Sequence, residues 1–237
     1  MKIGFWGKLL LSGVLVSLVF TLAVSYSYSE PPGQAVFAVA VPRNVPTLIV
    51  DPGHGGADGG AVSVTGTYES KINLDIALKI EEIAGFFGMT PVLTRSTEEL
   101  TYPESAGTIR AKKVADQKAR AALINSMENA VLISIQQNKY TSPGPSGSQV
   151  FYAPTGGSDG LAVFMQETLL SQVSPTNRRT ASKIPDSIYL LNNIQCPAVL
   201  IECGFVSNPT EAQLLEDAAY QTKLAAIILG SYLGFYS

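Results

Sequence analysis

The chain has 237 residues, a formal net charge of −3 and a hydrophobic fraction of 46%. At roughly 150 residues per domain, this length fits one domain with a short additional segment and is sufficient for a full hydrophobic core. Charged residues make up only 15%, below the usual value of about 25%, which argues against a disordered chain and against a nucleic-acid-binding protein. The 2 cysteines and the single histidine, His54, exclude a disulfide-rich scaffold, a four-cysteine zinc module and a metal site with two or three histidine ligands.

The N-terminus combines a basic start with a long uncharged stretch. Lys2 and Lys8 precede an uncharged run over residues 9–29, which would rise about 32 Å as a helix and so could cross a bilayer. The same pattern is typical of a signal peptide. We therefore predict a signal peptide or membrane anchor over residues 1–29, followed by a proline-punctuated linker over 30–45. Either form places the rest of the chain outside the cytoplasm, and a buried core helix is the alternative to export.

Beyond residue 45, short apolar runs alternate with segments of helical period. Continuous apolar runs indicate buried strands, and apolar residues spaced by three and four indicate helices. We expect strands at 47–51, 91–95, 130–135, 149–152, 188–191 and 198–202. We expect helices at 72–87, 111–127, 161–171, 209–217 and 220–233. This alternation predicts a single α/β domain over residues 46–237, with a mostly parallel or mixed sheet covered by helices on both faces and preceded by the N-terminal hydrophobic helix.

Polar side chains follow three of the expected strands at their carboxyl ends, which is where sites form in α/β sheets. Asp51 and His54 stand at the start of a glycine-rich loop after the first strand. Gln136 directly follows the expected strand at 130–135, and Glu202 ends the last expected strand at 198–202. Glu69 opens the helix after the glycine loop, so we expect it near His54 at the same edge of the sheet. The sequence therefore predicts a cleft lined by a histidine, carboxylates and a carboxamide.

Each of these residues also has a purely structural interpretation. His54 could be a surface or helix-capping residue, Glu69 could favour the positive end of a helix dipole, and Gln136 could be an ordinary hydrogen-bonding loop residue. Glu202 is harder to explain in that way, because a carboxylate at the end of an apolar strand is costly to bury without a partner. A phosphate-binding glycine loop is disfavoured, since Asp58 stands where the third glycine of the G-x-G-x-x-G pattern belongs and no P-loop lysine follows.

The two cysteines flank the last expected strand. Cys196 and Cys203 are seven residues apart, and an extended chain of that length spans about 23 Å, far beyond the roughly 7 Å limit for a disulfide. We therefore expect both to be unpaired and buried. A nucleophilic Cys203 would need His54 as its base, and such an enzyme would be sensitive to thiol alkylation and resistant to chelators.

At these residues the sequence resembles the zinc-dependent N-acetylmuramoyl-L-alanine amidases of the Amidase_3 family, over about residues 46–236. Within the family it is most similar to the spore-cortex, germination-specific branch, because of the stretches INLDIA, GSQVFYAP, NRR, IYLL and ECGFVSN together with the single N-terminal membrane segment. The family resemblance is carried by LIVDPGHGGADGGAV (48–62), Glu69, LTRS (93–96), Asp116 with Arg120, LISIQQN (132–138), GSQVFY (147–152) and PAVLIECGFVSNPTEAQLL (197–215).

The resemblance implies a site and a reaction. His54 and Glu69 match the first two zinc ligands of the family, and Glu202 matches its catalytic glutamate, the general base. Gln136 stands where the family has its third ligand, a histidine. The implied cofactor is Zn²⁺, which supplies Lewis acidity. The implied reaction is cleavage of the amide between N-acetylmuramic acid and the L-alanine of the stem peptide, ahead of muramic-lactam formation in the spore cortex.

Gln136 leaves two functions open. A carboxamide oxygen is neutral and binds zinc more weakly than an imidazole, so the chain is expected to be either a weakened amidase or an inactive relative that binds peptidoglycan. The expected partner is peptidoglycan in both cases, with no nucleic acid. The expected location is extracytoplasmic, membrane-anchored or secreted, and the branch implies the forespore-facing envelope space.

Overall fold

The computed structural model of the chain describes residues 45–237 and, before them, only residues 7, 13 and 17. The expected signal peptide or anchor over 1–29 and the linker over 30–45 thus lie almost entirely outside the described residues. Within the described part of the chain, no helix combines the length and the apolar character that a membrane span requires.

The described domain is built on one six-stranded mixed sheet with the strand order β2-β1-β3-β6-β4-β5. Strands β1, β2, β3 and β6 are parallel to one another, whereas β4 is antiparallel to β6 and β5 is parallel to β4. The strands are β1 Thr47–Pro52, β2 Val92–Leu93, β3 Ala130–Asn138, β4 Gln149–Tyr152, β5 Ser182–Lys183 and β6 Ala198–Phe205. The predicted α/β class with a mixed sheet is confirmed.

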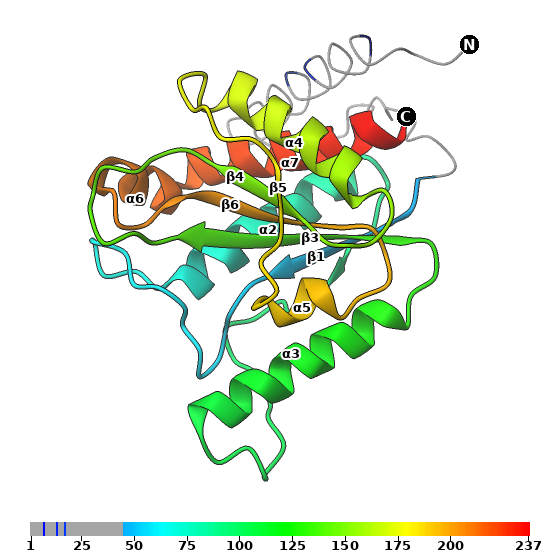
Figure 1. Cartoon of the computed structure of the whole chain (residues 1–237), viewed down its shortest axis with the longest axis vertical. Coiled ribbons are helices and arrows are strands. Elements are labelled where there is room, and N and C mark those ends of the chain that lie inside the picture. Colours follow the sequence, from blue (N-terminus) through cyan, green and yellow to red (C-terminus); the bar gives the residue numbers. More distant parts are fainter. Residues whose placement is uncertain (1–6, 8–12, 14–16, 18–44) are drawn as a thin grey trace, which may run out of the picture.

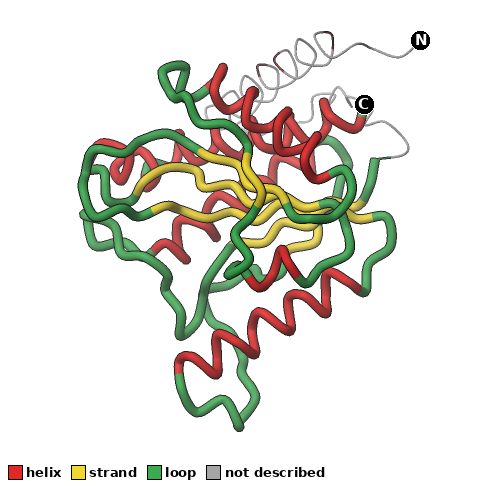
Figure 2. Tube along the Cα trace, in the orientation of Figure 1, coloured by secondary structure: helices red, strands yellow, loops and turns green. Residues whose placement is uncertain are grey.

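Helices cover both faces of this sheet (Figures 1 and 2). Because successive side chains in a strand point to opposite faces, each central strand contributes to two cores: Ile133 of β3 belongs to the core under α2, α4 and α7, and Leu132 to the core under α3 and α5. The helices are α2 Glu69–Phe86, α3 Ile109–Asn125, α4 Ser158–Gln172, α5 Tyr189–Asn192, α6 Pro209–Glu216 and α7 Ala218–Tyr236.

Local sequence signals set the ends of several helices. Thr108 caps α3 by accepting a hydrogen bond from the N–H of Ala111, and Asn208 caps α6 just before the proline at its first position, as both residue types favour. Gly88, with a φ of 68°, follows the end of α2. Glycine reaches this left-handed conformation at little cost, which explains why the predicted apolar repeat stops there.

Three sequence predictions differ from the structure. The apolar run 188–191 was expected to be a strand but forms the short helix α5, because its two leucines pack into the second core while Tyr189 faces solvent. Short apolar runs do not distinguish a buried strand from a buried helical turn. The strand at 91–95 is only two residues long, and β5 was not predicted. Both cysteines are free, as expected, but Cys203 is buried whereas Cys196 is only half-buried.

Candidate active site

The carboxyl ends of β1, β3 and β6 meet at one edge of the sheet. Gln136 and Glu202 are direct register partners on the neighbouring strands β3 and β6. Their side chains lie on the same face as Leu132 and Leu200, the face covered by α3 and α5. The carboxamide and the carboxylate predicted from the sequence thus stand side by side, and their neighbourhood is fixed by strand pairing.

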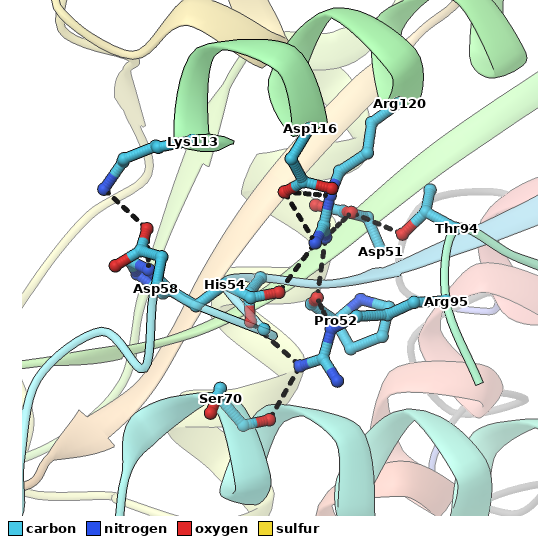
Figure 3. Close-up of polar contacts among 12 residues, drawn as sticks. Asp51, Pro52, His54, Asp58, Ser70, Thr94, Arg95, Lys113, Asp116 and Arg120 are labelled. Carbon is cyan, nitrogen blue, oxygen red and sulfur yellow. Dashed lines mark hydrogen bonds and ion pairs between the residues drawn. The ribbon is translucent and has the colours of Figure 1, made fainter. Parts of the chain in front are cut away.

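The glycine-rich loop after β1 is held from two sides by buried arginines (Figure 3). Arg120 of α3 donates to the carbonyl oxygens of Pro52 at 2.8 Å and His54 at 2.6 Å, and it forms an ion pair of 2.7 Å with Asp51. Arg95, after β2, donates to the carbonyl oxygen of Pro52 at 2.9 Å. His54 has a φ of 62°, which non-glycine residues rarely adopt, so the arginines fix a backbone conformation that the residue does not favour by itself.

The loop brings His54 against Glu69, the first residue of α2. Nε2 of His54 lies 3.5 Å from Oε2 of Glu69. Gly60, with a φ of 69°, passes so close to this pair that a Cβ there would come within 2.7 Å of Glu69 and 2.8 Å of His54. A glycine is therefore required for the loop to close over the two side chains.

The other ring nitrogen of His54 is oriented by a carboxylate. Nδ1 lies 3.0 Å from Oδ2 of Asp58, and the same oxygen pairs with Nζ of Lys113 at 2.9 Å. Burial alone would raise the pKa of Asp58, but the hydrogen bonds and charges of Lys113 and His54 lower that pKa to about 2. Because an ionised carboxylate only accepts, Nδ1 carries the proton. In the neutral imidazole the lone pair of Nε2 then faces Glu69.

Glu69 is itself fixed by backbone groups. It is buried, and its two oxygens accept hydrogen bonds of 2.9 Å from the N–H groups of Ala61 and Gln137. The side chain of Gln137 in turn donates to Asn73 of α2 at 3.1 Å. Glu69 therefore has a single position, set by the glycine loop, the end of β3 and its own helix.

Glu202, by contrast, lacks a complete set of partners. Within the described residues, its buried Oε2 has no hydrogen-bond partner. Burial, with a further contribution from the charge of Glu69, raises the pKa of Glu202 to about 8. The arrangement leaves a carboxyl group that can hold or release a proton near neutral pH, as a general acid–base group must.

Gln136 packs over the start of the glycine loop. A Cβ on Gly53 would collide with its carboxamide, and Nε2 lies 3.4 Å from Oγ of Ser134, two residues earlier on the same face of β3. Gln136 thus lies against Gly53, the residue before His54.

Cys203 does not share this site. It follows Glu202 in β6, so its side chain points to the opposite face, where it belongs to the core under α2, α4 and α7. Burial, above all, raises the pKa of its thiol to about 12. A buried, protonated thiol on the far face of the sheet cannot act as a nucleophile with His54, and this alternative is wrong.

The structure brings together the four side chains named from the sequence, in two pairs: His54 with Glu69, and Gln136 with Glu202. Within the part of the chain that the structure describes, no three His, Cys, Asp or Glu side chains gather as a metal site. Sequence reasoning missed the role of Lys113, for which the local pattern gives no signal, and took Asp58 only as a departure from a phosphate-loop pattern.

Comparison with known proteins now identifies the class. The sequence profile of the family described as N-acetylmuramoyl-L-alanine amidase, Amidase_3, matches residues 48–231, and the chain belongs to this family of amide hydrolases. The germination-specific N-acetylmuramoyl-L-alanine amidase of Bacillus subtilis (strain 168) is 31% identical over 233 residues, which cover 98% of this chain and 94% of that protein.

Solved structures agree with this assignment. The CwlD amidase from Clostridioides difficile, solved in complex with the GerS lipoprotein, has 39% sequence identity and a TM-score of 0.73, and the match covers 78% of this chain and 95% of that chain. An N-acetylmuramoyl-L-alanine amidase from Clostridium difficile 630 has 32% identity and a TM-score of 0.66, covering 79% and 95%. The predicted family is confirmed, and the germination-specific relative and CwlD are consistent with the spore-cortex branch.

Proposed function

We propose that this chain hydrolyses the amide between N-acetylmuramic acid and the L-alanine of the peptidoglycan stem peptide, in maturation of the spore cortex. The observation that carries the proposal is Glu202, whose buried Oε2 has no partner among the residues that the structure describes. Glu202 is in register with Gln136, and the charge of Glu69 contributes to its raised pKa. Family membership supports the reaction, and the germination-specific relative supports the biological setting.

The donor set fits a divalent cation at two of its positions. The lone pair of His54 Nε2 and the carboxylate oxygen of Glu69 face each other at 3.5 Å. Ligands of a tetrahedral Zn²⁺ with bonds of about 2.0–2.1 Å lie roughly 3.3–3.4 Å apart. The hydrogen bond from His54 to Asp58 is the outer-shell partner that metal-binding histidines typically have. Glu202 and Glu69 also form a pair of neighbouring carboxyl groups whose mutual repulsion a cation would relieve.

The third ligand in this proposal is the carboxamide oxygen of Gln136. It is a neutral oxygen where imidazole would bind zinc more strongly, so we expect weaker zinc binding than a site with a second histidine would give. When bound, Zn²⁺ supplies Lewis acidity for water and for the amide carbonyl.

The residues of the chain perform the remaining steps. Glu202, in its ionised form, takes a proton from the attacking water and passes it to the nitrogen of the departing L-alanine. His54 and Glu69 keep fixed positions because backbone groups, Asp58 and two arginines hold them. His54 and Glu69 therefore hold a fixed geometry, and Glu202 transfers the proton.

The segment over residues 1–29 completes the proposal. A basic start followed by an uncharged run of 21 residues supports export, as a signal peptide or an anchor. An enzyme acting on peptidoglycan must reach the outside of the cytoplasmic membrane, and we propose an extracytoplasmic location on these two grounds.

The direct test is release of stem peptides. Purified full-length protein is incubated with peptidoglycan and Zn²⁺, and free N-terminal alanine is quantified by mass spectrometry. We expect release by the wild type and none by Glu202→Gln. Wild-type protein that binds peptidoglycan but releases nothing at saturating zinc would refute the enzyme proposal in favour of the binding protein.

Gln136→His separates a weakened enzyme from an inactive one. We expect this variant to bind zinc more tightly and to release peptides faster than a wild type that is already active. If activity appears only in the variant, the natural chain is a peptidoglycan-binding protein.

A further inference from the structure

Two surface hollows are lined by segments next to the elements that carry the site. One, of about 530 Å³, lies on the β1 side and includes the glycine loop, Tyr68, Lys71 and Glu98. The other, of about 580 Å³, lies on the β4 side, between the loop before β4 and the loop after α4. An amide substrate has an arm on each side of the bond that breaks, so each hollow is a place for one arm. The β4-side hollow is lined by Ser146, Gly147, Asn177, Arg178, Arg179 and Glu211, among others.

The β4-side hollow begins close to Glu202. Gln149 of β4 is the antiparallel register partner of Glu202, and Gly147 is two residues before it. With strands about 4.8 Å apart and about 3.4 Å of rise per residue, the backbone of Gly147 lies within roughly 10 Å of Glu202. About three residues of an extended peptide span this distance.

Two arginines supply the positive charge and the hydrogen-bond donors of this hollow. Arg178 donates through Nη1 to the carbonyl oxygens of Pro175 and Asn177. Arg179 donates through Nη1 to the carbonyl oxygens of Ser146 and Gly147, with its guanidinium 4.8 Å from the ring centroid of Phe205. These contacts use one of the three guanidinium nitrogens of each arginine and leave the others as donors.

Neither arginine is neutralised by a carboxylate. Among residues 45–237, neither has an ion pair within 4.0 Å, whereas the buried Arg95 and Arg120 and the loop-holding Lys113 all do. Glu211 also lines the hollow, but its two oxygens accept from the N–H groups of Gly147 and Phe205. The formal charge of the three side chains is +1, with free donors only on the arginines.

The β1-side hollow has no such excess of positive charge. Its cation, Lys71, already pairs with Asp75 at 2.7 Å, and Glu98 in its lining pairs with Arg95 at 3.2 Å. It also presents Tyr68, which is 56% exposed, an aromatic surface suited to a neutral sugar ring. Charge thus distinguishes the two hollows.

We propose that the β4-side hollow is the subsite for the acidic peptide arm of the substrate, with Arg178 and Arg179 binding its carboxylates. This inference rests on the proposed function for the identity of the substrate. Guanidinium groups bind carboxylates through paired N–H donors, and the spacing from Glu202 matches carboxylates two to three residues beyond the scissile amide. The uncharged glycan arm then lies on the β1 side.

Binding is tested without turnover, in the full-length Glu202→Gln protein. The probe is N-acetylmuramoyl-L-alanyl-D-glutamyl-L-lysine, as the free acid and with both carboxylates converted to primary amides, and affinity is measured by calorimetry. We expect the free acid to bind about tenfold more tightly than the diamide. Adding Arg178→Gln should remove most of this preference and leave the affinity for the diamide unchanged.

Matched variants decide the interpretation. Lys118→Gln removes one exposed positive charge from α3, away from the hollow, and should keep the preference. Arg179→Lys keeps the charge but loses the paired donors, and should weaken free-acid binding with an unchanged melting temperature. Equal affinity for both probes, no binding of the free acid, or equal losses in Arg178→Gln and Lys118→Gln would overturn the proposal. A charge-selective protein whose wild type releases no peptide would instead refute the catalytic function and keep the acidic-peptide subsite.

Discussion

The two halves of the site are built in opposite ways. On the β1 side, His54 is held by a carboxylate on its ring and an arginine on its carbonyl oxygen, and Glu69 by two backbone N–H groups. On the β6 side, Glu202 is half-buried, and its buried Oε2 has no partner among the described residues. An enzyme needs both properties: groups that hold a fixed geometry cost little reorganisation during reaction, and a group that moves a proton must not be fully satisfied beforehand.

The largest expected effect is the loss of activity when Glu202, on the β6 side of the site, is changed. Glu202→Gln removes the group that exchanges the proton and keeps its shape, so peptide release should fall by about 10²–10⁴-fold. Glu128→Gln is the matched control, because Glu128 is exposed beyond the opposite edge of the sheet, and it should retain full activity. Initial rates of alanine release measure both, and a Glu202→Gln variant with more than a tenth of the wild-type rate would contradict a proton-transfer role.

The second largest expected effect is a loss of stability when Arg120, which holds the β1 side of the site, is changed. Arg120 is buried and pairs with the buried Asp51, and the two aspartates it contacts raise its pKa against the effect of burial. Arg120→Ala leaves Asp51 charged and poorly compensated, which typically costs about 3–5 kcal/mol of unfolding free energy. Arg110→Ala, an exposed arginine on the same helix, should cost less than about 0.5 kcal/mol. Urea denaturation compares the two variants. Similar losses of unfolding free energy would show that the buried ion pair between Arg120 and Asp51 contributes no more to stability than an exposed arginine does.

The sheet and the strand-end residues could be predicted because their signals are local. Five of the six expected apolar runs contain strands. Because the carboxyl ends of parallel strands share an edge, the sequence could place Gln136 and Glu202 at the same edge as the glycine loop. The helix α5 could not be predicted, because its four residues form a helix only through packing against the second core.

The supports of the site could not be predicted for a different reason. Lys113 reaches Asp58 from a helix that begins about 50 residues further along the chain, and no local pattern records such a long-range pairing. The register between Gln136 and Glu202 is likewise a property of the assembled sheet. The sequence shows the chemistry of each residue. Which charged side chains contact one another depends on the folded structure.

A third prediction concerns pH and again separates the two halves. The pKa of Glu202 is about 8 in the folded protein, against an ordinary value of 4.5. The folded state therefore binds more protons than the unfolded state between these values, and the free energy of unfolding of the metal-free protein should fall as pH rises from about 5 to about 8. The loss should be on the order of a few kcal/mol at most.

Glu202→Gln should abolish this slope and be more stable than the wild type at pH 8.5. Denaturation in the presence of a chelator at pH 5, 7 and 8.5 measures it. Asp58, whose pKa is about 2, stays ionised throughout this window and adds no slope. A wild type whose stability is constant from pH 5 to 8.5 would mean that Glu202 has a partner in solution.

The smallest effect concerns the orientation of His54. Asp58→Asn keeps the shape of the side chain but removes the carboxylate that accepts from Nδ1, so the ring loses the partner that fixes its tautomer. Loss of such a partner typically lowers metal affinity by about 10–100-fold, and calorimetric titration with Zn²⁺ measures it without reference to activity. Lys113→Met removes only the exposed cation that pairs with Asp58, and surface ion pairs contribute about 1 kcal/mol or less, so its loss should be at most about fivefold. If Lys113→Met weakens zinc as much as Asp58→Asn does, the lysine and not the carboxylate determines the orientation of His54, and the rigidity of the β1 side depends on α3 rather than on the glycine loop.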